Sequence, residues 1–562
     1  MKKKQKDSTN LVIITVGLIL LNALGNYFYK RYDLTQDNRF TLSEAAKDIV
    51  ASVDSPIVIN VFLKGNFPAE FRRLQSETAQ LLEEFSVTNS NISYDFINPL
   101  DNKENPTAIR QQLQQMGLTT AQIEVRENGK VSTELIYPWA LAYYNEKTVK
   151  ISLLKNQLGI TSEERVNNSI QNLEYTFVDA FNKLIFPKKR KIAVLKGNGE
   201  LEDRFLANFF KTLKEYYYIA PFTLDSAKVS PVKTLKELSI YDLIVIAQPS
   251  QVFSDSEKYI LDQYTMNGGA SLWLLDGSEQ RIDPATGKTY AVARDLELND
   301  LFFKYGCRIN SNLIKDVISA PIVLASGNEN DSQYNRYPWF YFPLSASDNS
   351  HPIATNIEAV KFEYTSSIDT LANPLKKTVL LSSSAIAKPV GLPIEINYDS
   401  DIPKFLKIME EGPLPTDFSQ GEQPLAVLLE GRFPSAFANR IKPFKFSNDK
   451  KIGISNKMVL VGDGDIIKNQ FQGNRPLEVG FDKMTQTMYG NKDFLLNTVN
   501  YLLDDTGLIN IRTKQITIPF LDPQKTASDR TKWQLINLLF PLGLLALFGI
   551  VFKYYRKQKY TV

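Results

Sequence analysis

The chain has 562 residues, enough for roughly two to four domains of ordinary size. Apolar residues make up 43% of it and charged residues 23%, shares that exclude a largely disordered chain. The net charge is +3, but the first seven residues carry +3 and the last ten carry +4, which leaves −4 for the rest. The positive charge therefore lies at the two ends and indicates no nucleic-acid surface. The single cysteine, Cys307, excludes an intrachain disulfide.

Two apolar segments, 11–29 and 533–552, flank the rest of the chain. A helix needs about 20 apolar residues to cross the hydrocarbon core of a bilayer. The second segment carries no charge over 20 residues, and its Pro541 is tolerated because membrane helices accommodate proline. The sequence therefore predicts two membrane-spanning helices with the lipid bilayer as partner. Small and polar residues favour contacts between helices in lipid, and they are here Asn22, Gly25, Asn537 and Gly543.

Lysine and arginine are concentrated outside the two apolar segments, in the tails 1–10 and 553–562. Cytoplasmic flanks carry such an excess, so both termini are expected in the cytoplasm and the body between the helices on the other side, in the periplasm. A cleaved signal peptide, with Ala23-Leu24-Gly25 as the small-residue site, remains an alternative for the first segment. The body faces the same way under both interpretations.

The pattern after the first apolar segment predicts a small α/β domain. A helix opens near Leu42-Ser43-Glu44, and strands over 57–63 and 92–97 alternate with helices over 71–85 and 109–116. A hairpin follows, with strands over 123–126 and 130–136 joined by Asn128-Gly129, a favoured turn pair. This order of elements resembles a thioredoxin-like domain. The redox motif Cys-x-x-Cys is absent, so no redox chemistry is assigned.

A second α/β unit follows a long amphipathic helix that ends at Pro187. Strands over 191–195, 241–247 and 270–275 alternate with helices over 201–216 and 254–266, which predicts a doubly wound parallel sheet with both faces covered. The alternation of strands and helices stops after residue 280 and resumes with a strand over 457–461 and a helix over 491–503. The predicted segments are a basic tail (1–10), a membrane helix (11–29), a connector (30–55), the thioredoxin-like domain (56–160), a linking helix (161–190), the first part of the α/β domain (191–280), an irregular, β-rich insertion (281–450), the second part of the α/β domain (451–505), a stalk (506–532), a second membrane helix (533–552) and a basic tail (553–562).

Polar residues follow the strands of the predicted parallel sheet. Ligands of such sheets bind beyond the carboxyl ends of the strands, so these residues are expected to share one rim. We hypothesise a vestigial or peptide-binding cleft there, against the alternative that glycine and aspartate simply end the strands. The candidate cleft residues are Asn198, Glu200, Gln248, Ser250, Asp276, Ser278 and Asp463.

Motifs for catalysis are weak. Gly287-Lys288-Thr289 imitates the end of a phosphate-binding loop, but position 282 is isoleucine where the first glycine is required, so an exposed turn is expected and any ATPase must be another chain. Cys307 in a predicted strand is expected to be a core residue, and His351 in a turn is expected to cap or pack. One cysteine and one histidine do not make a usual zinc site. The Asp463 to Asp465 turn can either hold a cation or close tightly. We therefore predict no catalytic residue, cofactor or metal.

Further short motifs lie along nearly the full length of the chain, together with both apolar segments. Taken together they resemble the gliding-motility-associated auxiliary proteins of ABC transporters, the GldG family, within the wider family of extracytoplasmic ABC-transporter auxiliary proteins. The α/β unit also resembles the class I glutamine-amidotransferase-like fold without its catalytic cysteine. The residues that carry the first resemblance are Arg31-Tyr32-Asp33-Leu34-Thr35, Phe40-Thr41-Leu42-Ser43, Tyr241-Asp242-Leu243-Ile244-Val245, Tyr264 to Gly269, His351-Pro352-Ile353, Val461-Gly462-Asp463, Gly490-Asn491-Lys492-Asp493, Asn497 and Asn500-Tyr501-Leu502.

The resemblance implies a non-enzymatic subunit of an inner-membrane complex needed for gliding. Its implied partners are a separate membrane permease and a separate cytoplasmic ATPase, and no nucleic acid. The family label "substrate-binding" is conventional, and the sequence itself shows no substrate. Two other functions stay open: a solute- or peptide-binding component of an ABC transporter, and an amidotransferase-like hydrolase working at the sheet rim.

Overall fold

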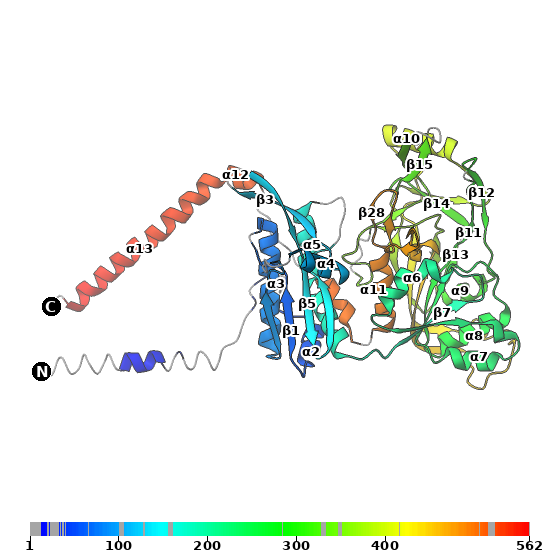
Figure 1. The fold of residues 1–562 in the computed structure, drawn as a ribbon, viewed down its shortest axis with the longest axis horizontal. Helices are drawn as coiled ribbons and strands as arrows, with labels where there is room; N and C mark the ends of the chain where they lie inside the picture. Colours follow the sequence, from blue (N-terminus) through cyan, green and yellow to red (C-terminus); the bar gives the residue numbers. More distant parts are fainter. Residues whose placement is uncertain are drawn as a thin grey trace. The chain divides into compact units, whose positions relative to one another are not determined.

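In the computed structural model, the N-terminal domain is built on a four-stranded mixed sheet (Figure 1). The structure describes residues 13–19, 22, 33, 35, 39, 41–65, 67–100, 106–127, 130–155, 161–283, 285–326, 333–346, 351–414, 416–504, 506–514 and 523–560. These residues fall into two compact units, 1–515 and 516–562, and each is described by itself.

The four-stranded sheet has the order β2-β1-β5-β6. β1 pairs in parallel with β2 and antiparallel with β5, which pairs antiparallel with β6. The alternating exposure of β1 shows why this sheet forms: Ile57, Ile59 and Val61 are buried while Val58 points outward. The elements are β1 (Ile57–Val61), β2 (Ile92–Phe96), β5 (Trp139–Tyr144) and β6 (Lys147–Ser152), with helices α2 (Glu44–Ala51), α3 (Ala69–Thr88), α4 (Pro106–Gln115) and α5 (Ser162–Ile185).

The predicted hairpin exists but lies outside this sheet. β3 (Ala121–Glu127) and β4 (Lys130–Ile136) pair only with each other among the described residues, whereas β5 and β6 supply the antiparallel strands of the main sheet. The predicted hairpin is therefore confirmed, but the antiparallel strands of the main sheet, β5 and β6, were not predicted. The sequence of β5 gave no alternating signal, because three successive residues, Ala140, Leu141 and Ala142, are all buried.

Three segments predicted to lie outside the N-terminal domain pack into its core. α2 comes from the predicted connector, α5 from the predicted linking helix, and the 3₁₀ helix η3 (Leu508–Thr513) from the predicted stalk. Their side chains Ile49, Phe177 and Leu508 belong to one buried cluster with the sheet. These boundaries are corrected accordingly: after the second domain, the chain returns to its first domain at η3.

The second domain contains a seven-stranded sheet with the order β20-β23-β24-β10-β9-β7-β8. The five strands from β24 to β8 are mutually parallel, which confirms an α/β fold with a parallel sheet. β9 is buried at all five positions because helices cover both faces. The parallel strands are β7 (Lys191–Lys196), β8 (Tyr218–Thr223), β9 (Leu243–Ala247), β10 (Ala270–Leu274) and β24 (Ile452–Val461).

Helices flank this sheet (Figure 1), and each face has its own core of buried side chains. α6 (Asp203–Leu213) and α11 (Asn491–Leu503) cover one face, where Phe209 and Phe494 are fully buried. α8 (Asp255–Met266), preceded by a Ser254–Glu257 capping box, lies on the other face with α7 (Pro231–Leu238) and α9 (Asn299–Tyr305).

The predicted insertion boundary at residue 450 was wrong. β20 (Lys376–Ser382) and β23 (Pro424–Pro434) lie within 281–450, yet they form the antiparallel edge of the main sheet. The remainder of the insertion folds into a lobe with a core of its own around Trp339, Tyr341 and Phe405. The lobe is made of α10 (Tyr398–Glu411) and short strands such as β12 (Lys288–Ala293), β14 (Asn312–Asp316), β15 (Ile322–Ser326), β16 (Gln333–Tyr337), β21 (Ala387–Gly391) and β22 (Ile394–Asn397). The smaller elements of the domain include η1 (Asp225–Lys228), β11 (Ser278–Glu279), β13 (Cys307–Ile309), β17 (Leu344–Ser345), β18 (Val360–Lys361), β19 (Ile368–Thr370), η2 (Asp465–Ile467), β25 (Phe471–Gln472), β26 (Arg475–Pro476), β27 (Phe481–Asp482) and β28 (Thr487–Met488).

The second compact unit contains α12 (Pro523–Ser528) and the long helix α13 (Arg530–Tyr560). Within the described residues, one helix is long and apolar enough to cross a membrane, at Arg530–Gln558, and Pro541 lies inside it. Of the first apolar segment, residues 13–19 and Asn22 are described and are helical; the rest, including Gly25, lies outside the described residues. The prediction of a second membrane helix over 11–29 therefore stays a prediction.

Candidate functional site

The carboxyl ends of the parallel strands form one rim, as the topology requires. Across the sheet the parallel strands lie in the order β8-β7-β9-β10-β24, so the direction of winding reverses between β7 and β9. Ligand sites of doubly wound sheets lie beyond the strand ends at such a reversal. The predicted cleft residues follow β7, β9, β10 and β24, and the structure separates them into two groups.

Asp276 is the centre of the first group. It follows β10 and is 8% exposed. Its carboxylate accepts hydrogen bonds from the Gln248 side-chain amide at 2.8 Å and from the backbone N–H of Gly464 at 2.5 Å, and Arg294 lies 3.4 Å away. Gln248 is held with φ +53°, a conformation that few residues other than glycine adopt. The three donors fix the Asp276 carboxylate against the loop that follows β24.

That loop brings two more carboxylates to Asp276. Oxygens of Asp276, Asp463 and Asp465 all lie within 4.8 Å of one another. Asp463 is fully buried and accepts the backbone N–H groups of Glu363 at 2.6 Å and of Asp465 at 2.7 Å. We call these three residues the acidic rim.

Two glycines permit this approach of the loop. A Cβ atom at Gly462 would lie 2.1 Å from the carbonyl oxygen of Ser366, and one at Gly464 would lie 2.6 Å from Cβ of Gln248. Both are closer than atoms of real side chains approach each other. The Gly-Asp-Gly-Asp sequence is therefore a tight strand-end turn, and the same turn aims Asp463 into the rim.

Burial and mutual repulsion change the acidity of the rim. Burial, together with the negative charge of Asp465, raises the pKa of Asp276 to about 6. The same causes, with the charge of Asp276 added, raise the pKa of Asp463 well above its ordinary value. Burial and repulsion thus favour the protonated forms of Asp276 and Asp463, and a cation bound among the three carboxylates would relieve the same repulsion.

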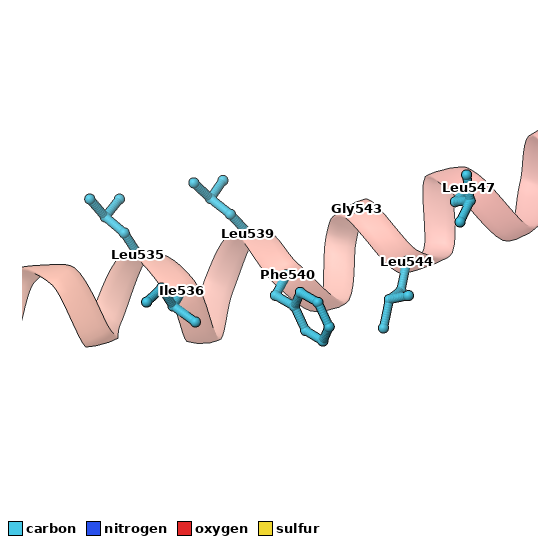
Figure 2. Close-up of a pocket in the computed structure, with 7 residues that line it drawn as sticks. All are labelled: Leu535, Ile536, Leu539, Phe540, Gly543, Leu544 and Leu547. Atoms are coloured by element: carbon cyan, nitrogen blue, oxygen red, sulfur yellow. The ribbon is translucent and has the colours of Figure 1, made fainter.

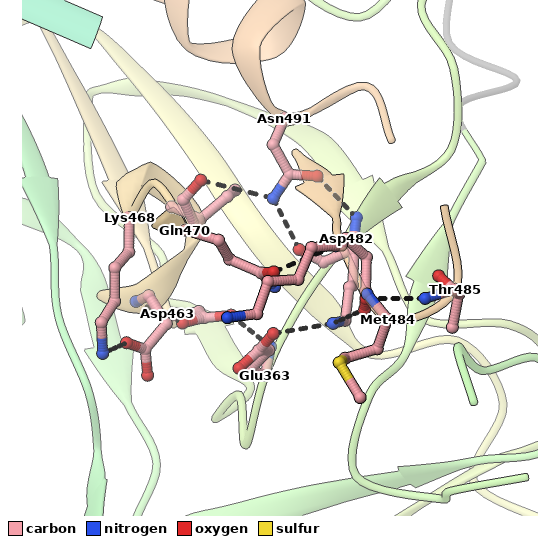
Figure 3. A network of polar contacts seen from close by, with 12 residues as sticks. Glu363, Asp463, Lys468, Gln470, Asp482, Met484, Thr485 and Asn491 are labelled. Carbon is pink, nitrogen blue, oxygen red and sulfur yellow. Dashed lines mark hydrogen bonds and ion pairs between the residues drawn. The ribbon is translucent and has the colours of Figure 1, made fainter. Parts of the chain in front are cut away.

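Cationic side chains contact the acidic rim and its neighbours, and Figure 3 shows Lys468 and Asp463 with the polar network around Glu363 and Asp482. Lys468 pairs with Asp465 at 3.2 Å, and Lys361 bridges Glu363 at 2.8 Å and Asp482 at 3.2 Å. Burial alone would lower the pKa of Lys361, but the two carboxylates outweigh it and raise that pKa. Both partners of Lys361 keep it charged, so it contributes a fixed positive charge next to Glu363.

The second group of predicted residues lies at the end of β7. Asn198 is buried, its N–H donates to the Glu200 carboxylate at 2.9 Å, and its carbonyl accepts the N–H of Ser250 at 3.0 Å. Burial raises the pKa of Glu200. Ser278 is buried and donates to Gln280 at 2.8 Å. Arg294 lies between the two groups, 3.5 Å from the carbonyl of Pro249 and 3.4 Å from Asp276.

Sequence reasoning missed the residues that the insertion adds to the site. Arg294, Lys361 and Glu363 come from segments that show no regular pattern, and Asp482 from a short β-pair after β24. Of the site residues outside the predicted list, only Asp465 was indicated by the sequence, because Gly464-Asp465 repeats the Gly462-Asp463 pair of the strand-end turn. No spacing rule brings the others to the rim, because each depends on where the insertion crosses the sheet edge.

The side chains of Cys307 and His351, the two other residues of reactive type, are packed against neighbouring residues. Cys307 is fully buried in β13, and burial raises the pKa of its thiol to about 12. His351 packs edge-on against Tyr501 with ring centroids 4.7 Å apart, and its Nδ1 accepts the N–H of Ile353. Burial lowers the pKa of His351 to about 4, so its ring is neutral at pH 7. Neither side chain takes part in the hydrogen bonds of the acidic rim described above.

A family model described as an ABC-type uncharacterized transport system, the ABC-transporter auxiliary family, matches residues 189–498, more than half of the chain. The chain belongs to this family. The matched residues include the seven-stranded sheet, the insertion and the acidic rim. A second model, for a domain of unknown function, matches residues 36–143 of the N-terminal domain. Membership supports an accessory role for this auxiliary protein in an ABC-type transport system and an association with the membrane.

Relatives of the auxiliary protein extend the match over its whole length. An uncharacterized protein of Borreliella burgdorferi is 21% identical over 567 residues, covering 100% of both chains. A solved structure named mmIFT52 N-terminal domain aligns with 56% of this chain and 98% of that chain, at 14% identity and a TM-score of 0.32. A TM-score that low defines neither fold nor function.

The acidic rim predicts a specific pH dependence of stability. Because the native pKa of Asp276 is about 6 against an ordinary 3.8, the native state loses stability as the pH rises through about 6. Asp465→Asn removes one repelling charge, so we expect it to raise the stability at pH 8 by about 1–2 kcal/mol and to have no effect at pH 4. The thermal unfolding midpoint of the full-length protein in detergent measures this.

The exposed Asp255→Asn on α8 is the matched control, and it should show no such pH dependence. A destabilising effect of Asp465→Asn at pH 8 would show that its pairing with Lys468 outweighs the repulsion within the rim.

Proposed function

We propose that the chain is a non-enzymatic auxiliary subunit of an ABC-type inner-membrane complex, working with a separate permease and a separate cytoplasmic ATPase. The family match carries the proposal, because that family is defined by ABC-type transport. The acidic rim supports a non-enzymatic role: Asp276 and Asp463 are held by backbone and amide donors rather than beside a nucleophile. The thiol of Cys307 and the ring of His351 lie in packed surroundings.

The topology we propose has two membrane helices, both termini in the cytoplasm and the body in the periplasm. α13 supports it at one end, since its apolar side chains are exposed all around the helix, as expected for a helix surrounded by lipid. The basic residues Lys553, Arg556 and Lys557 follow the apolar stretch and favour the cytoplasm. The helical residues 13–19 agree with a helix over 11–29.

The specific assignment we propose is to the gliding-motility branch, the GldG family. The two-anchor layout and the motifs along the chain support it. The strand order β2-β1-β5-β6, with one parallel and two antiparallel pairings, supports a thioredoxin-like N-terminal domain. The central parallel sheet, flanked by helices on both faces, supports an amidotransferase-like second domain.

One face of α13 is suited to packing against a helix of the permease. A shallow hollow at Gly543 is lined by Leu535, Ile536, Leu539, Phe540, Leu544 and Leu547. Figure 2 shows Leu535 and Leu539 pointing to one side of the helix and Ile536, Phe540 and Leu544 to the other. A Cβ atom at Gly543 would meet nothing within 4 Å. Glycine lets another helix backbone approach closely, and such small residues mark helix contacts in lipid. Gly543 is therefore the residue on which we expect the permease to pack; Asn22 and Asn537 are the polar candidates.

Labelling of single cysteines tests the topology. The native Cys307 is buried, so an introduced cysteine is the main target of a membrane-impermeant maleimide. We expect Lys233→Cys, exposed on α7, to react in intact spheroplasts and Gln558→Cys, at the end of α13, to react only after permeabilisation. Reaction of Gln558→Cys in intact spheroplasts would contradict a cytoplasmic C-terminus.

Co-purification tests the packing on α13. Gly543→Leu fills the hollow between the surrounding side chains, and we expect it to reduce the amount of permease and ATPase that co-purify with the protein by at least about tenfold. Gly549→Leu makes the same change on the same helix, outside the hollow, and should leave co-purification unchanged. Equal yields from both variants would remove Gly543 from the interface, and the absence of any permease with the wild type would refute the proposed complex.

The second candidate function is solute or peptide binding at the sheet rim, which the position of the acidic rim beyond the carboxyl ends of β10 and β24 favours. An amidotransferase-like hydrolase is the third, and the buried setting of Cys307 counts against it.

A further inference from the structure

A cavity of about 350 Å³ lies in the lobe, and none of the acidic-rim residues lines it. The C-terminal half of α10 supplies one wall, with Lys404, Lys407 and Ile408. The antiparallel pair β14–β21 supplies another, with Lys315 and Lys388. The residues that follow α10 contribute the third wall. Volumes of this size hold small ligands in proteins of known function.

Gly412 shapes the third wall of the cavity. Its N–H donates to the carbonyl four residues earlier in α10, and its φ of +84° is a conformation that glycine adopts without strain. The chain thereby leaves the helix and turns, and the N–H of Asp417 donates to the carbonyl of Leu414 at 3.0 Å. This turn adds the apolar side chains of Leu414 and Phe418 to the lining.

The apolar part of the lining is open to a ligand. Leu414 is 62% exposed, and Ile408 and Phe418 are half-buried. Covering such side chains with an apolar group removes their surface from water, which is favourable in proportion to the area covered. A ligand with an apolar body therefore gains binding free energy at this wall.

Two lysines stand opposite each other on the strand wall. Lys315 of β14 and Lys388 of β21 are directly paired, so their side chains lie on the same face, where like charges destabilise the pairing. Burial lowers the pKa of Lys315; Asp401, 3.2 Å away, opposes that shift, and the charges of Lys404 and Lys388 add to it. Lys388 is exposed and forms no ion pair with the described residues. An anion between the two ammonium groups would relieve their repulsion.

The charge around the cavity favours a ligand with a single negative charge. Four lysines line the cavity together with two carboxylates, those of Glu411 and Asp417. Glu411 lies 3.8 Å from Lys407. The buried Asp401 pairs with two of the lysines, at 3.2 and 4.0 Å. Four lysines against three carboxylates leave one positive charge, which a monoanion balances.

We propose that this cavity binds a small carboxylic acid with an apolar body. The carboxylate lies between Lys315, whose side chain is 18% exposed, and the fully accessible Lys388. The body lies against Ile408 and Phe418 and covers Leu414. The inference goes beyond the proposed function, because it concerns the lobe alone and is measured by binding, whichever complex the protein joins.

Isothermal titration calorimetry tests the inference on the full-length protein in phosphatidylcholine nanodiscs, where no detergent competes for the apolar wall. The probes are phenylbutyrate, its neutral amide phenylbutyramide, acetate and the tripeptide Gly-Gly-Phe, and empty nanodiscs are the blank. We expect saturable binding of phenylbutyrate and binding of the other three weaker by at least about tenfold. The amide lacks the charge, acetate lacks the body, and the tripeptide carries an added ammonium group.

Charge variants test the lysine wall. Lys388→Glu should weaken phenylbutyrate by at least about tenfold, whereas Lys388→Arg, which keeps the charge, should bind within about twofold of the wild type. Lys388 is exposed, so neither variant disturbs a buried contact. Lys288→Glu makes the same reversal at an exposed position of β12, in the same lobe and outside the lining, and should bind as the wild type does.

A second pair of variants tests the apolar wall. Leu414→Ser should weaken phenylbutyrate by at least about threefold, because less apolar surface is covered. Met409→Ser is the matched control, since Met409 is 63% exposed on α10 and does not line the cavity. Each of the following results would overturn the inference: no saturable binding of phenylbutyrate, equal binding of its amide, undiminished binding by Lys388→Glu or by Leu414→Ser, or tighter binding of the tripeptide, which would assign the cavity to the carboxyl end of a peptide.

Discussion

The parallel pairing of β24 with β10 is the interaction on which the second domain depends. β10 ends at Leu274 and β24 begins at Ile452, so the chain must leave the sheet, build the lobe and return before the pairing forms. Closing so long a connection costs conformational entropy, although that cost grows slowly with length. Burial offsets it: Met458, Val459 and Leu460 of β24 are at most 1% exposed, with cores on both faces of the sheet.

The same pairing creates the acidic rim. Asp276 follows β10 and Asp463 follows β24, so two strands lying side by side bring their next acidic residues together. Burial and the neighbouring negative charges raise the pKa of both carboxyl groups, so holding them ionised in this position is unfavourable. Two buried carboxylates next to a third, partly exposed one are costly for stability. The rim is therefore the part of the sheet edge where a proton or a cation matters most.

The sequence predicted the elements that carry their own periodic signal. α11 lies at 491–503 as predicted, and the capping signal at Ser254 precedes α8. The rim was predictable in outline because parallel strands end at one edge. Pairings between distant segments were not: β23 lies in the predicted insertion, and nothing in its residues shows that it borders β24 rather than the lobe. Likewise the apolar residues of η3 give no sign that they return to the N-terminal core.

Amide hydrogen exchange of the full-length protein across a denaturant series tests most directly whether the β24–β10 pairing holds the domain together. If it does, peptides covering β9, β10 and β24 lose protection together, through one opening with a common midpoint. If β24 exchanges at a lower denaturant concentration while β9 and β10 stay protected, the central sheet is stable without β24, and the account of the domain given above is wrong.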